Sequence, residues 1–197
     1  MAELFYQGHA SFRITTDSGC VIYVDPYAGK GYDEPADLVL VSHEHFDHNN
    51  IKLVKLKKNG KIYRSSDLLV NGEYRSVEFN GVQIQATPAC NKNHPIEQCV
   101  GFLITADQRT IYAAGDTSKT SYMSEKLANI AIDYALLPTD GVYNMNVHEA
   151  SECAKVIGAK HNIPIHMVVG DLFDEKIADA FQANGKIVLK PGMKIRL

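Results

Sequence analysis

The chain has 197 residues, of which 45% are hydrophobic and 22% charged, and its 20 basic and 23 acidic residues give a net charge of −3. This length predicts one domain, residues 1–197, with a sizeable core, and the composition excludes a disordered or fibrous protein. The acidic balance argues against a nucleic-acid partner, and no apolar run reaches the roughly 18 residues of a membrane span. Because no basic stretch precedes an apolar segment at the start of the chain, we expect a cytoplasmic protein without a membrane partner.

The first half of the chain is rich in predicted strands. Segments 12–16 and 20–25 flank a turn signal, Asp17-Ser18-Gly19, and predict a hairpin. Segment 37–42 is a continuous apolar run, which is typical of a strand that is covered on both faces. Segment 49–58 places apolar residues among lysines at helical spacing, so we expect a short helix there. Further strands are predicted at 61–64, 74–79, 82–87, 100–105 and 110–113.

The second half interleaves helices with strands. Helices are predicted at 122–129, 148–159 and 172–183, and strands at 134–138 and 163–166. Two mixed sheets packed face to face, with helices on both outer faces, would satisfy this order. The expected fold class is therefore an α+β sandwich.

A histidine-rich motif, Ser42-His43-Glu44-His45-Phe46-Asp47-His48, follows the apolar strand at 37–42. Side chains in a loop at the carboxyl end of a buried strand are exposed at one edge yet firmly rooted, so they can converge on one point. Imidazole and carboxylate ligands suit zinc, and manganese or iron could also accept them. Since four ligands within one turn cannot all reach a single tetrahedral ion, we expect two adjacent divalent ions. His43 and His45 would hold one of them, and Asp47 and His48 the other.

Three further candidate ligands lie at the ends of predicted strands. His94 lies in the loop after 82–87, Asp116 directly follows 110–113, and His166 ends 163–166. Asp116 could offer one oxygen to each ion and so bridge them. Divalent cations lower the pKa of bound water from about 15.7 to about 7 and favour an anionic or strongly polarised substrate. The residues therefore predict metal-assisted hydrolysis.

The motif His43-x-His45-x-Asp47-His48 resembles that of the metallo-β-lactamase superfamily, as do Gly115-Asp116-Thr117 and Ile165-His166. Segments such as Gly8-His9-Ala10-Ser11-Phe12 and 112–117 are similar to a small UlaG-like branch, which includes ascorbate-phosphate lactonase and many metal-dependent hydrolases without a known substrate. The resemblance runs from about residue 5 to the end of the chain. It implies an αββα sandwich with a dinuclear site at one edge between the sheets.

The resemblance also implies a role for each candidate ligand. His43, His45 and His94 would hold the first ion, whereas Asp47, His48 and His166 would hold the second. Asp116 would bridge the two ions, and Asp25 would steady the histidine loop from outside the ligand set. Asp47 and Asp116 are the predicted catalytic residues.

One departure from the family pattern concerns the third histidine. Relatives often place it immediately after Pro-Ala, but here Cys90 follows Pro88-Ala89 and His94 comes four residues later. Cys90 is therefore an alternative ligand to His94. His9 and Tyr143 are candidate substrate contacts, His9 because its turn could face the site and Tyr143 because its loop follows a buried strand.

The predicted function is hydrolysis of an ester, lactone or phosphoester bond in a small, anionic substrate by hydroxide bound to two metal ions, most simply zinc. One alternative is a di-iron redox enzyme of the same fold, although such enzymes commonly use more carboxylate ligands and an attached flavin domain. Another is a metal-binding sensor without catalysis. A homo-oligomer is also expected, because relatives often assemble.

Overall fold

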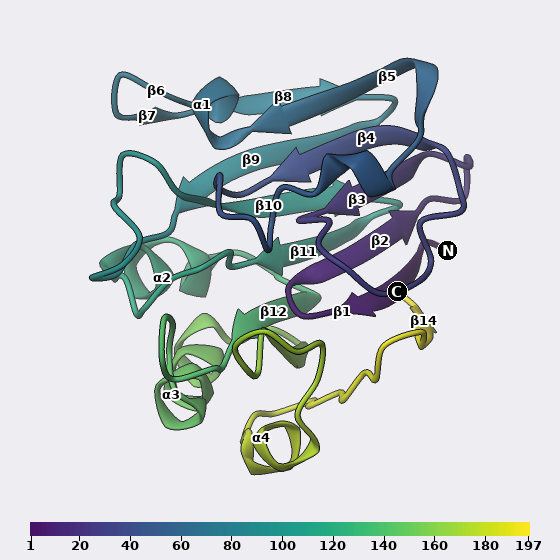
Figure 1. The fold of residues 1–197 in the computed structure, drawn as a ribbon. Coiled ribbons are helices and arrows are strands. Elements are labelled where there is room, and N and C mark those ends of the chain that lie inside the picture. The colour runs from purple at the N-terminus through teal and green to yellow at the C-terminus, as the bar shows by residue number, and fades with distance from the viewer.

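The computed structural model describes residues Met1–Leu197 and contains two six-stranded mixed sheets that face each other (Figure 1). The first sheet has the order β14-β1-β2-β3-β4-β5, with β1 Glu3–Gly8, β2 Ser11–Thr15, β3 Val21–Val24, β4 Ala36–Val41, β5 Leu56–Arg64 and β14 Lys194–Arg196. The second has the order β13-β12-β11-β10-β9-β8, with β8 Ser76–Phe79, β9 Val82–Pro88, β10 Val100–Ala106, β11 Arg109–Ala113, β12 Tyr134–Pro138 and β13 His161–Ile165. A small hairpin joins β6 Leu69–Val70 to β7 Glu73–Tyr74. This arrangement confirms the predicted α+β sandwich.

The two sheets share one pairing pattern. In the first sheet β3, β4 and β5 run parallel and the other neighbours are antiparallel. In the second sheet β11, β12 and β13 run parallel and the other neighbours are antiparallel. Parallel strands end at a common edge, and the arrows of β4, β11 and β12 point to the same side of the molecule (Figure 1).

Strand alternation divides the apolar residues between an inner core and two outer layers. Leu38 and Leu40 of β4 point into the core between the sheets, whereas Val39 and Val41 pack on the outer face. The inner core joins residues of both sheets, such as Phe12, Phe102 and Leu136. Each sheet thus covers one apolar face of the other.

Helices cover the outer face of the second sheet. Its outward side chains, such as Tyr112 and Leu137, pack against Met123, Leu127 and Ile157. These last three belong to α2 Ser121–Glu125, η2 Leu127–Asn129 and α3 Val147–Ile157. The outer face of the first sheet has a thinner cover than the predicted helical layer, because only the short turn η1 Ile51–Leu53 and neighbouring loop residues pack there.

The predicted helix at 49–58 is wrong, because only η1 is helical and β5 begins at Leu56. Its apolar residues instead cover the first sheet, where Ile51 and Val54 pack against the outward side chains of β3 and β4. Lys57 and Lys58 of the segment lie on the exposed edge strand β5, where charged side chains discourage pairing with another chain.

The predicted helix at 172–183 is shorter in the structure, where α4 spans Glu175–Ala180. Asp174 begins it by accepting a hydrogen bond from the backbone N–H of Ile177. Phe181 leaves the helix with extended backbone and is buried in the cluster beneath α3. The short helix α1 Ser65–Leu68 and the strands β1 and β14 were not predicted. None of the helices is both long enough and apolar enough to cross a membrane.

Candidate metal centre

The histidine motif forms the loop that leaves the carboxyl end of β4, and Asp25 anchors it. Asp25 accepts hydrogen bonds from the backbone N–H and the hydroxyl of Ser42, both at 2.7 Å. The same carboxylate lies 3.0 Å from His48 Nδ1 and so orients that ring. Asp25 follows β3 and is buried, so neighbouring parallel strands hold this loop in a fixed position.

The predicted ligands from four separate loops converge at this edge of the sandwich. Asp116 is the central group, because its carboxylate oxygens lie 3.3 Å from His48 Nε2, 3.3 Å from His94 Nε2 and 3.5 Å from His166 Nε2. His43 Nε2 lies 4.0 Å from the same carboxylate, and His45 Nδ1 lies 3.2 Å from His94 Nε2. Three sets of ligand atoms lie within 4.8 Å of one another, namely His43-His45-His94, His43-His48-Asp116 and His9-Asp47-His48-His166.

Gly115 allows Asp116 to reach the centre. Its backbone has a φ of +65°, and a Cβ atom at this position would lie 2.6 Å from the carbonyl oxygen of Val100. Only glycine fits both conditions without strain or a clash. The Gly115-Asp116 pair therefore turns the chain sharply at the end of β11 and directs the carboxylate inward.

Buried ligand atoms without hydrogen bonds make the cluster suitable for cations. His43 Nε2, His48 Nε2, Asp116 Oδ1 and His166 Nε2 are all buried and make no hydrogen bond. Buried polar atoms normally have a hydrogen-bond partner or a bound ion, so four unpartnered ligand atoms in one place indicate a binding site. Imidazole nitrogens and carboxylate oxygens are ligands that a divalent transition metal accepts. The residues present therefore fit a metal centre.

The ionisation of the cluster also suits a cation. Burial, reinforced by the charge of His48, lowers the pKa of His43 to about 2, so its ring is neutral as a ligand must be. Burial alone would raise the pKa of Asp116, but His48 and His166 together hold it well below its usual value. Asp116 is therefore ionised, and it contributes a negative charge at the centre of the cluster.

A chain of polar side chains links two of the predicted ligands from behind. Asn91 Oδ1 lies 2.9 Å from His94 Nδ1, and Asn91 Nδ2 donates to Asn144 Oδ1. Asn144 Nδ2 donates in turn to Asp140 Oδ2, which lies 3.0 Å from His166 Nδ1. Sequence reasoning missed these three positions, although Asp140 follows the predicted strand at 134–138 as Asp116 follows its own strand. We conclude that Asn91, Asn144 and Asp140 orient His94 and His166.

His9 and Tyr143, the two predicted substrate contacts, have different environments. His9 is fully buried, with Nδ1 2.9 Å from the carbonyl oxygen of Asp171 and Nε2 3.2 Å from Asp47 Oδ2. Both ring nitrogens of His9 thus have partners within the protein, one of them the candidate ligand Asp47. Tyr143 is 48% exposed and lines the cavity above the centre.

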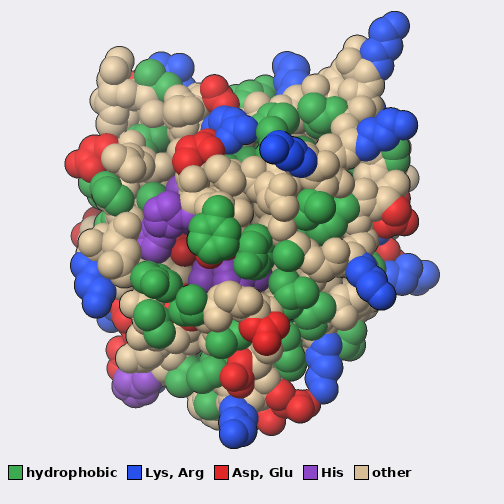
Figure 2. All heavy atoms as spheres, in the orientation of Figure 1, with side chains coloured by type: hydrophobic (Ala, Val, Ile, Leu, Met, Phe, Trp, Pro, Cys, Tyr) green, Lys and Arg blue, Asp and Glu red, His purple; other side chains and the backbone are tan.

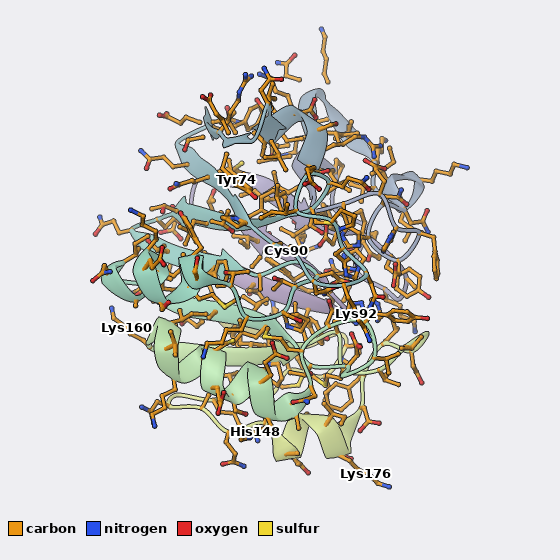
Figure 3. All side chains as sticks on the ribbon, turned by 90° about the vertical axis from the view of Figure 1, so that its left-hand side faces the viewer. Tyr74, Cys90, Lys92, His148, Lys160 and Lys176 are labelled. Atoms are coloured by element: carbon orange, nitrogen blue, oxygen red, sulfur yellow. The ribbon has the colours of Figure 1, made fainter.

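Cys90, the alternative to His94, lies outside each set of clustered ligand atoms. Its backbone N–H donates to Thr117 Oγ1, and burial raises the pKa of its thiol, which therefore stays protonated. His94, by contrast, is buried beside His45 and Asp116. Figure 3 looks onto this loop and labels Cys90 and Lys92 on it, with His148 below on α3. The geometry brings His94, and not Cys90, to the centre.

A cavity of about 490 Å³ opens onto the cluster. Its polar floor includes His45, Asp47, His94, Asp116 and His166. Its volume falls within the roughly 300–1,000 Å³ of small-molecule sites. A small substrate could therefore reach the candidate ligands directly.

Comparison with known proteins identifies the family. Residues 3–166 match the model of the beta-lactamase superfamily domain. The chain belongs to the beta-lactamase superfamily. This confirms the resemblance that the histidine motif indicated.

Relatives within this superfamily are metal-dependent hydrolases. The chain is 32% identical over 186 residues to a UPF0173 metal-dependent hydrolase of Methanoregula boonei, covering 83% of this chain and 81% of that protein. It is 26% identical over 228 residues to one of Sulfolobus acidocaldarius, over the full length of both. The structure of Igni18, a metallo hydrolase of Ignicoccus hospitalis, superposes with a TM-score of 0.77 at 25% identity, covering 98% of this chain and 97% of that chain.

Proposed function

We propose that this protein is a hydrolase that uses two divalent metal ions, most simply zinc, to cleave an ester, lactone or phosphoester bond of a small substrate. The observation that carries the proposal is the convergence of five histidines and two aspartates from four loops beneath one cavity. The metal-dependent hydrolases among its relatives support the same class of reaction.

In this proposal two neighbouring sets of residues hold the ions. His43, His45 and His94 hold one, and Asp47, His48 and His166 hold the other. Asp116 lies close to ligands of both sets, so its carboxylate would be shared between the two ions. When bound, the two cations would supply Lewis-acid chemistry, polarising the scissile group and acidifying water, and they would favour an anionic reacting group.

The two aspartates have separate tasks. Asp47 is partly accessible, with 20% of its side chain exposed, whereas Asp116 is buried, with 3% exposed. Its Oδ2 faces His9 and His166, and hydrogen bonding from His9 keeps the pKa of Asp47 low despite burial. Because Asp47 is ionised and lines the cavity, we assign to it the transfer of a proton from attacking water to the leaving group. Asp116 keeps its negative charge among the imidazoles.

The metal content of the purified protein tests the proposal. We expect about two ions per chain by elemental analysis. We also expect hydrolysis of at least one class within a panel of esters, lactones and phosphodiesters. The double variant His43→Ala, His45→Ala should lose both the bound metal and the hydrolytic activity. Fewer than one ion per chain, unchanged in that double variant, would contradict the proposal. The variant His148→Ala is a matched control, because this histidine is exposed on α3 and lies outside the cluster.

A further inference from the structure

Three exposed apolar side chains surround the mouth of the cavity over the candidate centre. Phe46, Tyr143 and Val169 have exposed fractions of 74%, 48% and 47%, and all three line this cavity. Hydrophobic side chains gather around the histidines on this face of the molecule (Figure 2). We call these three residues the apolar rim. An exposed apolar group beside a functional site is typical of a binding surface.

The apolar rim is held in place by the loops that carry the candidate ligands. Phe46 lies between His45 and Asp47 in sequence, and its ring packs edge-on against Tyr27 with centroids 5.9 Å apart. Asp140 Oδ1 accepts hydrogen bonds from the backbone N–H groups of residues 142–144 and so fixes the turn that carries Tyr143. Val169 follows His166 by three residues. A group bound on the apolar rim would therefore lie next to the reacting atoms.

The lining of the cavity offers no lysine or arginine to a charged group of the substrate. Glu44 lines the cavity, and the guanidinium of Arg64 is paired with its carboxylate oxygens at 2.6 Å and 2.7 Å. A carboxylate or phosphate placed on the apolar rim would lose water without gaining a partner, and that loss is costly. An alkyl or aryl group there would instead be favoured by the removal of its surface from water.

We infer that the substrate carries an uncharged alkyl or aryl group beside the scissile bond, and that this group binds on Phe46, Tyr143 and Val169. The inference rests on the proposed hydrolase function and adds the chemical class of the substrate. A negative charge, where the substrate has one, belongs to the reacting group over the ligands and not to the part on the apolar rim.

A series of 4-nitrophenyl esters with one leaving group tests the inference. The kcat/KM of the metal-loaded protein is expected to rise about two- to fourfold per methylene from the acetyl to the hexanoyl ester, the upper figure corresponding to a fully buried methylene. The hemisuccinyl ester, with its carboxylate on the acyl chain, is expected to react at least tenfold more slowly than the butanoyl ester. Tyr143→Ser and Val169→Ser are expected to reduce the preference for the hexanoyl ester. Val142→Ser should leave it unchanged, because Val142 is exposed in the same loop but does not line the cavity.

Binding of hexanoate against acetate, measured by calorimetry, separates this inference from the proposed function. Hexanoate is expected to bind at least tenfold more tightly, and Tyr143→Ser should reduce the difference, whether or not esters are cleaved. If esters are cleaved with equal kcat/KM and the variants have no effect, the inference is overturned while the hydrolase proposal stands. If no ester is cleaved but hexanoate is preferred, the inference about the rim stands and ester cleavage fails. If the variants change the oligomeric state and not the preference, the apolar rim is an interface between copies and the inference is overturned.

Discussion

Three residues of the candidate centre have left-handed backbone, although none is glycine. His9, Asp25 and His166 have φ values of 57°, 45° and 45°. Such conformations cost on the order of 1–3 kcal/mol each and persist only when neighbours enforce them. Here the His166 N–H donates to the carbonyl oxygen of His9, and the Asp25 N–H donates to that of Leu40. The fold therefore gives up stability to direct these three side chains to one point.

Asp140 is the residue outside the predicted ligand set whose loss should be most informative. Its side chain is fully buried and lies between His166 and Asn144. We expect Asp140→Asn to weaken binding of one ion about 10- to 100-fold, because the amide no longer supplies a charged acceptor for His166 Nδ1. Competition with a chromophoric chelator measures this affinity. An unchanged affinity would show that Asp140 does not orient His166. Asp179→Asn, at an exposed position outside the clustered ligand sets, is the control.

Among the secondary-structure elements, those with a strong apolar pattern were predicted well. The strands β4, β10 and β12 were all predicted, and β4 was recognised by a continuous apolar run, because burial on both faces leaves that signature. The helix prediction for segment 49–58 was wrong because its apolar residues cover a sheet from a loop, and in a loop apolar residues at helical spacing do not indicate a helix. The pairing of β1 with β14 joins the two ends of the chain, and no local pattern reveals such a contact.

The residues of the candidate centre were also predictable where they lie at the ends of strands. The motif at 43–48 and the strand-end residues Asp116 and His166 were identifiable because a strand end fixes where a side chain lies. The linking residues Asn91 and Asn144 were not, since loops outside regular structure bring them together.

Asp133 directly precedes β12, and its backbone pairs with Thr110 of β11 and His161 of β13. We expect this residue to make the stability of the protein depend on pH. Burial alone would raise its pKa, but hydrogen bonds from Lys160 Nζ at 2.8 Å and from the N–H of Thr110 at 2.9 Å lower it below its usual value. A carboxyl with a lowered folded-state pKa stabilises the protein above its unfolded pKa, about 3.9, and this contribution is lost as the pH falls through the folded value.

We therefore expect Asp133→Asn to lower the free energy of unfolding by about 1 kcal/mol at pH 7, with a difference from wild type that shrinks as the pH falls below about 4. Urea denaturation at several pH values measures it. A difference that is independent of pH would show that the carboxylate charge has no part. Asp179→Asn, at an exposed position, is the control.

For the molecule as a whole, the repeated pairing pattern of the two sheets explains where the site lies. Asp25 follows β3 as Asp116 follows β11, and His9 lies between β1 and β2 as His94 lies between β9 and β10. Corresponding positions of the two sheets thus meet at one edge, where each sheet supplies a histidine and an aspartate. The sequence shows no short repeat, so this correspondence became visible only in the structure.

We propose that residues 1–197 form one domain, because the inner core includes residues of both sheets together with Ala2 and Leu197. The backbone N–H of Leu197 also donates to the carbonyl oxygen of Ala2 at 2.8 Å. One cooperative unfolding transition is therefore expected, with coincident midpoints by far-UV and near-UV circular dichroism. Two separate transitions would show that the sheets unfold independently.

Anomalous X-ray diffraction tests the proposed pair of metal ions directly, with crystals grown with zinc and measured on both sides of the zinc absorption edge. We expect two strong peaks beneath the cavity, one among His43, His45 and His94 and one among Asp47, His48 and His166, with Asp116 next to both. A single peak, or none within reach of these side chains, would contradict it.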